Sequence, residues 1–112
     1  MNTGSFFDLN DKTAIVTGAG NVIGKSASLT LAAFGANVVV SDLKPEDAEK
    51  VSEEINSQGG KSIALACNVT KDEDLQNLVK RAMEAFGRID ILVNNAGGGG
   101  AGSMGPPDVN SG

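Results

Sequence analysis

The feature that most constrains the fold is a regular alternation of short apolar runs with helix-like stretches. Four runs lack charged residues, and they cover residues 13–17, 37–41, 62–66 and 91–94. None alternates strictly between apolar and polar residues, which is typical of parallel strands covered on both faces. A strand followed by a helix and another strand favours right-handed crossovers and a parallel sheet. The sequence therefore predicts an α/β fold with the order β-α-β-α-β-α-β.

Three helix-like stretches lie between these runs, and each combines an apolar stripe with a glycine stop. The first stripe comprises Ala27, Thr30, Leu31 and Phe34, before Gly35. The second helix starts at Pro45, a good first-turn residue, and buries Ala48, Val51 and Ile55, before Gly59 and Gly60. The third stripe comprises Leu75, Leu78, Val79, Ala82 and Phe86, before Gly87. Thr70 and Glu73 have the spacing of a capping box, which predicts the start of the third helix.

A glycine-rich stretch, T-G-A-G-N-V-I-G at residues 17–24, connects the first apolar run to the first helix-like stretch. Glycines let the backbone turn sharply and let a pyrophosphate approach closely, and the helix N-terminus offers N–H groups to the anion. The alternative is a glycine-rich turn without a ligand, and the strand-to-helix context favours a dinucleotide-binding loop. Val22 stands where a further glycine is expected. We expect a helical backbone at Val22 and weaker dinucleotide binding than a glycine would allow.

Asp42 follows the second apolar run and lies 18 residues after Gly24. An acidic residue about 20 residues after such a loop accepts hydrogen bonds from the adenosine ribose. The same carboxylate would repel a 2′-phosphate, and residues 19–21 include no Arg or Lys. The pattern favours NAD over NADP as the cofactor, and a turn or helix-cap role for Asp42 is the alternative.

Composition argues against several classes of partner. The net charge is −5 and no basic patch stands out, so nucleic acid is not expected. No apolar run is long enough to span a bilayer, and the first residues lack the pattern of a signal peptide. We therefore expect no membrane partner and a cytoplasmic location. Cys67 is the only cysteine, which excludes an intrachain disulfide, and it is expected to pack as a small hydrophobe.

Four motifs resemble the short-chain dehydrogenase/reductase family, namely T-G-x-x-x-x-I-G, V-V-V-S-D, C-N-V-T and D-I-L-V-N-N-A-G. The resemblance covers roughly residues 6–100. Within the family, the four glycines after N-N-A, with T-G-A-G and V-V-V-S-D-L, most resemble bacterial NAD-dependent 7α-hydroxysteroid dehydrogenases. Acyl-carrier-protein reductases and other alcohol dehydrogenases share most of this pattern. The resemblance implies hydride transfer between NAD and a secondary alcohol or ketone, with the 7α-hydroxyl of a steroid as one candidate.

The resemblance also implies cofactor-binding roles. In the loop, Gly18, Ile23 and Gly24 would line the pyrophosphate and nicotinamide-ribose path, together with Gly20 and Asn21. Asp42 would hold the adenosine ribose, with Leu43 beside the adenine. Asn68 and Val69 take the place of the family's usual Asp-Val pair against the adenine, and the loss of charge at Asn68 is expected to weaken that contact. Asn94 would tie the fourth strand into the sheet, and the cofactor would be bordered by Asn95, Ala96 and Gly97.

The family's proton relay uses a Ser and a Tyr-x-x-x-Lys pair well after the N-N-A-G strand. This chain has no Tyr to supply the relay and no His to replace it near neutral pH. We therefore expect a truncated NAD-binding portion without catalytic residues, inactive by itself. It would be a partial Rossmann domain over residues 6–97, with sheet order 3-2-1-4. Residues 98–112 are expected to form a flexible Gly/Pro-rich tail.

Three alternatives stay open. The chain could be a non-catalytic dinucleotide-binding module. It could be a partner that self-associates, or that pairs with a full-length homologue through the exposed edge of the fourth strand. It could also derive from an enzyme that resembles 3-oxoacyl-carrier-protein reductases.

Overall fold

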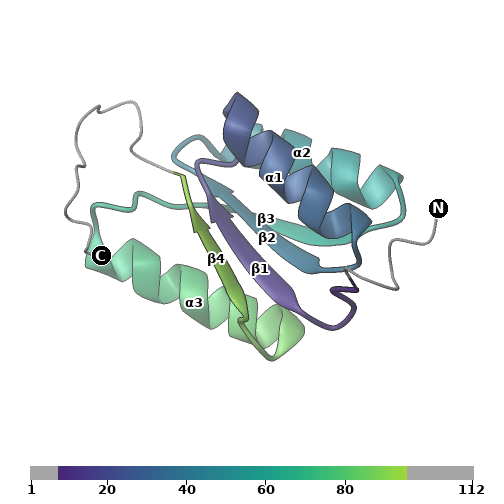
Figure 1. Ribbon diagram of the computed structural model, residues 1–112. Coiled ribbons are helices and arrows are strands. Elements are labelled where there is room, and N and C mark those ends of the chain that lie inside the picture. The colour runs from purple at the N-terminus through teal and green to yellow at the C-terminus, as the bar shows by residue number, and fades with distance from the viewer. Residues whose placement is uncertain (1–7, 96–112) are drawn as a thin grey trace.

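The computed structural model describes residues 8–95, in which strands and helices alternate. The strands are β1 (Thr13–Thr17), β2 (Asn37–Asp42), β3 (Lys61–Ala66) and β4 (Ile91–Asn94). The helices are α1 (Val22–Ala33), α2 (Pro45–Ser57) and α3 (Asp72–Phe86). All neighbouring strands are parallel, and their order in the sheet is β3-β2-β1-β4 (Figure 1). The predicted fold class and strand order are confirmed.

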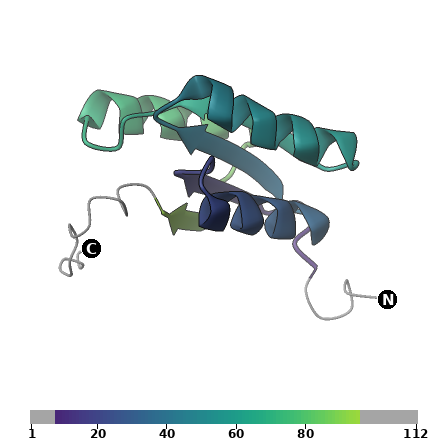
Figure 2. The same cartoon turned by 90° about the horizontal axis from the view of Figure 1, so that it is seen from above.

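The sheet is covered by α1 and α2 on one face and by α3 on the other, as Figure 1 shows from the side and Figure 2 from above. Successive side chains of a strand point to opposite faces, so each central strand contributes to two cores. Val16 and Val40 pack with Ile55 on the α1–α2 side, while Ile15 and Val39 pack around α3. All residues of β1 are buried, which agrees with its apolar, non-alternating sequence.

The predicted stripe of α1 is wrong in part. Thr30 is exposed and Ala27 is only half-buried, whereas Gly24 and Ser28 are the buried residues of this helix. The hydroxyl of Ser28 donates to the carbonyl oxygen of Gly24 at 2.8 Å, so its polar group can be buried. Small residues at buried positions let the helix pack closely. Because Gly24 and Ser28 are not large apolar residues, the apolar pattern of the sequence does not predict that they are buried.

The second helix agrees with the prediction, because Pro45 lies in its first turn and Ala48, Val51 and Ile55 are buried. The capping box predicted for the third helix is wrong. Helix α3 begins at Asp72, and Lys71 at the N-cap makes no side-chain capping bond. Thr70 instead donates its hydroxyl to the side-chain oxygen of Asn68 at 2.6 Å. Asn68 thus holds Thr70 in a turn before the helix starts.

The stripe of α3 is buried only near its middle. Leu78 and Ala82 are buried as predicted, but Leu75 is 36% exposed and Val79 is 48% exposed. None of the helices within residues 8–95 is long and apolar enough to cross a membrane. The expected tail at 98–112 lies outside the described residues. The first two and the last two residues of the expected domain at 6–97 also lie outside them.

Candidate functional site

The loop between β1 and α1 lies at the carboxyl end of the sheet, beside the point where the strand order reverses. Gly18 has a φ of 64°, in the left-handed region that favours glycine. The N–H of Ala19 donates to the carbonyl oxygen of Ser41 in β2 at 2.9 Å, so the loop is anchored on the neighbouring strand. Open α/β sheets bind ligands outside the carboxyl ends of their strands at such a switch point.

Gly24 allows α1 to start directly against this loop. A Cβ atom at Gly24 would lie 2.2 Å from the carbonyl oxygen of Gly18 and 2.8 Å from the Cα of Ala19. Both contacts are with backbone atoms, so only a glycine permits this approach without a shift of the helix. Gly24 therefore serves close packing of α1 on the loop, while Gly18 serves the turn.

The backbone of Val22 is helical, which confirms the sequence-based expectation. Helix α1 begins at Val22, and Asp11 is the only non-glycine residue with a positive φ within residues 8–95. The side chains of Val22 and Ile23 are 81% and 68% exposed. Amides in the first turn have no acceptor inside the helix, so these two N–H groups are available to an anion at the positive helix end.

Asn21 and Asn95 connect the loop to the end of β4. The side-chain oxygen of Asn21 accepts from the N–H of Gly24 at 2.9 Å, which caps α1. The same oxygen accepts from the side-chain nitrogen of Asn95 at 2.7 Å. That nitrogen also donates to the carbonyl oxygen of Gly18 at 3.3 Å. Two segments that are 74 residues apart in the chain are therefore joined at one amide.

Thr17, the last residue of β1, secures the end of β4 from the other side. Its hydroxyl lies 3.1 Å from the side-chain oxygen of Asn94 and accepts from the N–H of Asn95 at 3.0 Å. Asn94 thus contacts β1, which agrees with the role expected for it in tying β4 into the sheet. Thr17 was not among the predicted site residues, although its place at the end of an apolar run next to the glycine loop was a usable signal.

The carboxylate of Asp42 lies against the same loop. One oxygen accepts from the N–H of Gly20 at 2.9 Å, and the other accepts from the N–H of Lys44 at 3.0 Å. A carboxylate has about four acceptor positions, so Asp42 keeps capacity for further donors such as hydroxyl groups. A Cβ at Gly20 would lie 2.6 Å from the Cβ of Asp47, so Gly20 leaves room for α2. This packing role of Gly20 was not predicted from the sequence.

Asn68 and Val69 lie in the turn after β3, next to the end of β2. The N–H of Cys67 donates to the carbonyl oxygen of Asp42 at 2.9 Å, and the carboxylate of Asp74 accepts from the N–H of Asn68 at 2.8 Å. The side-chain oxygen of Asn68 accepts from the N–H and the hydroxyl of Thr70, so it is engaged within its own turn. Burial, and secondly the charge of Asp74, raise the pKa of the Cys67 thiol, which fits a packing role.

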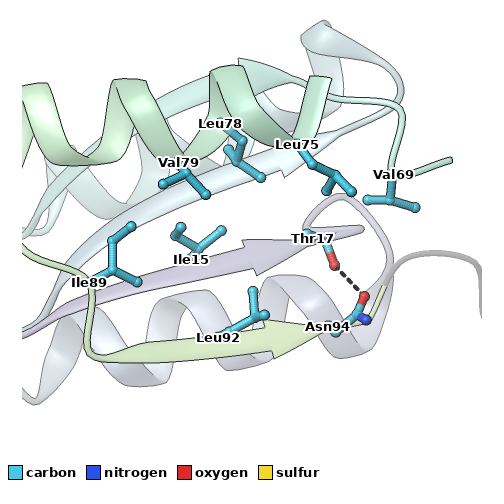
Figure 3. Close-up of a pocket in the computed structure, with 9 residues that line it drawn as sticks. All are labelled: Ile15, Thr17, Val69, Leu75, Leu78, Val79, Ile89, Leu92 and Asn94. Carbon is cyan, nitrogen blue, oxygen red and sulfur yellow. Dashed lines mark hydrogen bonds between the residues drawn. The ribbon is translucent and has the colours of Figure 1, made fainter. Parts of the chain in front are cut away.

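An apolar groove of about 400 Å³ runs between α3 and the β1–β4 side of the sheet (Figure 3). It is lined by residues from all three elements and from the adjoining loops, namely Ile15, Thr17, Val69, Leu75, Leu78, Val79, Ile89, Leu92 and Asn94. The exposed parts of Leu75 and Val79 border it, and Leu92 of β4 is 63% exposed. The groove is therefore apolar, with Thr17 and Asn94 as polar groups at one end.

The structure brings most of the expected residues together around the β1–α1 loop. Hydrogen bonds and direct contacts link Gly18, Gly20, Asn21, Gly24, Asp42 and Asn95. Ile23 lies on the exposed start of α1, and Leu43 is 66% exposed just after β2. Asn68 and Val69 lie at the end of β3, while Ala96 and Gly97 fall outside the described residues. Residues 8–95 include no group of three His, Cys, Asp or Glu side chains that could hold a metal ion.

Comparisons with known proteins agree with this geometry. The family described as "short chain dehydrogenase" matches residues 12–108. The chain is 48% identical over 92 residues to 7α-hydroxysteroid dehydrogenase of Escherichia coli, which corresponds to 82% of this chain and 36% of the relative. It is 44% identical over 88 residues to the 3-oxoacyl-[acyl-carrier-protein] reductase of Staphylococcus epidermidis, 78% of this chain and 36% of that relative. The chain thus spans about a third of the length of these curated relatives.

Solved structures of oxidoreductases also resemble this chain. The crystal structure of a hydroxysteroid dehydrogenase from Escherichia coli matches with a TM-score of 0.83 and 42% identity, over 96% of this chain and 46% of that one. An oxidoreductase of Haemophilus influenza with bound NAD matches with a TM-score of 0.75 and 37% identity, over 81% of this chain and 32% of that one. The family match over residues 12–108, the identity to curated relatives and the parallel sheet ordered β3-β2-β1-β4 all agree. The chain therefore belongs to the short-chain dehydrogenase family.

Proposed function

We propose that this chain forms the NAD-binding part of an oxidoreductase that transfers a hydride between NAD and a secondary alcohol or ketone. The observation that carries the proposal is the β1–α1 loop, in which Gly24 brings the positive end of α1 against the switch point of the sheet. The free first-turn amides of Val22 and Ile23 suit a pyrophosphate. The oxidised cofactor would accept a hydride from an alcohol and the reduced cofactor would donate one to a ketone, while the residues around the β1–α1 loop would bind and orient it.

The carboxylate of Asp42 is proposed to select NAD over NADP. It is held beside the loop by the N–H of Gly20 and keeps acceptor capacity for ribose hydroxyls. A 2′-phosphate at this place would meet a fixed negative charge. Lys25, a cation close to the loop in sequence, pairs with Glu54 on α2 at 3.3 Å, so this pairing offsets its charge. These contacts favour a ribose without a 2′-phosphate.

Calorimetric titration of the 112-residue chain with NAD and with NADP tests the proposal. Two like charges about 4 Å apart repel by about 1 kcal/mol per charge pair in water and by about 4 kcal/mol near a protein surface. We therefore expect NAD to bind about tenfold or more tightly than NADP, and Asp42→Asn to remove most of this difference. Asp11→Asn is the matched control, because it removes the same charge at an exposed position in the loop that precedes β1. Tighter binding of NADP by the unaltered chain would refute the proposed selectivity.

The chain by itself is proposed to be inactive, because its sequence contains no Tyr for the family's proton relay. Acid–base catalysis is typically worth about 10²–10⁴ in rate. The purified chain would be incubated with NAD and secondary alcohols that include bile acids, and NADH would be followed by absorbance. Steady NADH production above a blank without protein would contradict this expectation.

The substrate class is proposed from relatives. The 7α-hydroxysteroid dehydrogenase of Escherichia coli supports a steroid alcohol, and the reductase of Staphylococcus epidermidis supports a 3-oxoacyl thioester as the second candidate. A longer protein that contains this chain would be assayed with both substrate classes. Turnover of a 7α-hydroxylated bile acid, without reduction of a 3-oxoacyl thioester, is the expected result.

A pairing role is the second candidate function. Strand β4 hydrogen-bonds only to β1 within the described residues, and the side chain of Leu92 on it is 63% exposed. Unpaired strand edges are templates for pairing with another chain. Light scattering of the purified chain, alone and mixed with a full-length homologue, would detect such pairing, and a monomer under both conditions would contradict it.

A further inference from the structure

We propose that Asn21 is a positioning residue that locks the β1–α1 loop to the end of β4, so that the loop has its binding shape before the cofactor binds. The identity of the ligand rests on the proposed function. The locking itself rests only on the geometry of the loop.

A single side-chain oxygen joins the two segments. Oδ1 of Asn21 accepts from the N–H of Gly24 at 2.9 Å and from Nδ2 of Asn95 at 2.7 Å. Nδ2 of Asn95 also donates to the carbonyl oxygen of Gly18 at 3.3 Å. The helix start, the glycine turn and the strand end are therefore held by one pair of side-chain amides.

The anchor on β4 is itself fixed. The N–H of Asn95 donates to the hydroxyl of Thr17 at 3.0 Å, and Thr17 is the buried last residue of β1. Because β1 and β4 are hydrogen-bonded neighbours in the sheet, the position of Asn95 is set by the sheet and not by the loop. Through its hydrogen bond to Asn95, Asn21 thus attaches the loop to the sheet.

The loop needs such a support because it contains Gly18 and Gly20. Glycine loses more conformational freedom on ordering than any other residue, so an unsupported loop would become ordered only when the ligand binds. A site that is ordered beforehand avoids this cost and binds more tightly. Capping of α1 alone would fix the helix start but not the position of the loop relative to β4.

The substitution Asn21→Ser separates the two tasks of this side chain. Serine caps helices about as well as asparagine, so the bond to the Gly24 N–H can be replaced. Its hydroxyl lies one bond closer to the backbone, so it does not reach Asn95 while it caps the helix. We expect NAD binding by the full 112-residue chain to weaken about three- to tenfold, the effect of about one hydrogen bond, with little change in the melting temperature.

The matched control is Asn37→Ser. Asn37 also makes a side-chain contact between neighbouring strands, to the hydroxyl of Thr13 at 3.4 Å, but it lies at the amino end of β2, away from the loop. NAD affinity should not change in this variant. Asn95→Ala and the double variant complete a cycle with Asn21→Ser, and the two effects on NAD affinity should be clearly less than additive if they act through one contact.

A measurement without cofactor tests the locking independently. Amide hydrogen exchange in residues 20–24 of the cofactor-free chain should become several-fold faster in Asn95→Ala, while exchange in the middle of α1 stays unchanged. Unchanged exchange in the loop, or fully additive effects on NAD affinity, would overturn this inference. If the unaltered chain binds no NAD but its loop exchange responds to Asn95→Ala, the locking stands and the proposed function fails.

Discussion

Replacement of Gly24 by alanine should destabilise the chain by about 2 kcal/mol, even though alanine is the better helix former. The new Cβ would lie 2.2 Å from the carbonyl oxygen of Gly18 and 2.8 Å from the Cα of Ala19. These are backbone atoms of a loop that is hydrogen-bonded to β2, so no side chain can rotate away to make room. The start of α1 must therefore move outward from the sheet.

The expected magnitude combines three effects. Overpacking of this kind costs typically about 1–3 kcal/mol, and contact with backbone atoms favours the upper part of this range. An outward shift also stretches the capping bond between Asn21 and the N–H of Gly24, which is now 2.9 Å long, and loss of a cap costs about 1 kcal/mol. Alanine regains about 1 kcal/mol through its higher helix propensity. The net loss is about 2 kcal/mol.

Urea unfolding and thermal melting, both followed by circular dichroism, measure this loss. A change of about 2 kcal/mol lowers the melting temperature of a domain of this size by about 10 °C. The control is Ser26→Ala, an exposed position two residues further along the same helix, which should change stability by less than about 0.5 kcal/mol. An unfolding midpoint of Gly24→Ala at or above that of the unaltered chain would refute the packing argument.

Three further predictions concern single side chains. Val22→Gly should tighten NAD binding because it removes a branched, exposed side chain beside the helix N-terminus, at a cost of about 1 kcal/mol in helix stability; equal or weaker affinity in a folded variant, measured by calorimetry, would contradict this. The Cys67 thiol, whose pKa is raised by burial and by Asp74, should react with iodoacetamide far more slowly in the native chain than in urea, and equal rates would be inconsistent with its burial. The Arg88 guanidinium and the N–H of Thr13 lower the pKa of Asp90 from 3.8 to about 2, so its contribution to stability is complete above about pH 4 and is lost as the pH falls towards 2. Asp90→Asn should therefore flatten the dependence of stability on pH in this range, and an unchanged acid titration would argue against the contribution of Asp90.

The sequence by itself predicted the architecture because the governing signals are local. The apolar residues of β1 and β4 define strands whose bounds agree with the structure, and Gly87, with a φ of 80°, ends α3 as expected. The parallel order followed from alternation, since crossovers between parallel strands have a fixed hand. The glycine turn between β1 and α1 was likewise predictable, because a strand, glycines and a helix start are adjacent along the chain.

Other features depended on which segments meet in space. The fully buried residues of α1 are Gly24 and Ser28, and Leu29, Leu31 and Ala32 pack partly buried beside them. The predicted cap at Thr70 is absent because α3 begins at Asp72, one residue later than a cap at Thr70 requires, and the turn formed with Asn68 holds Thr70 before the helix. Neither outcome could be read from the hydrophobic pattern, which registers apolar side chains and not the room available to them.

The candidate site depended on both the sequence and the tertiary structure. The sequence predicted that Gly18, Asn21, Asp42 and Asn95 belong to one candidate site, but it assigned no contact among them. Tertiary structure decided that Asp42 accepts from Gly20 and that Asn95 reaches Asn21. Those bonds exist because parallel pairing of β1 with β2 and with β4 brings the carboxyl ends of three strands to one edge, and the register of that pairing sets which side chains face each other. Local sequence patterns carry no information about that register, so only the assembled sheet could specify the contacts.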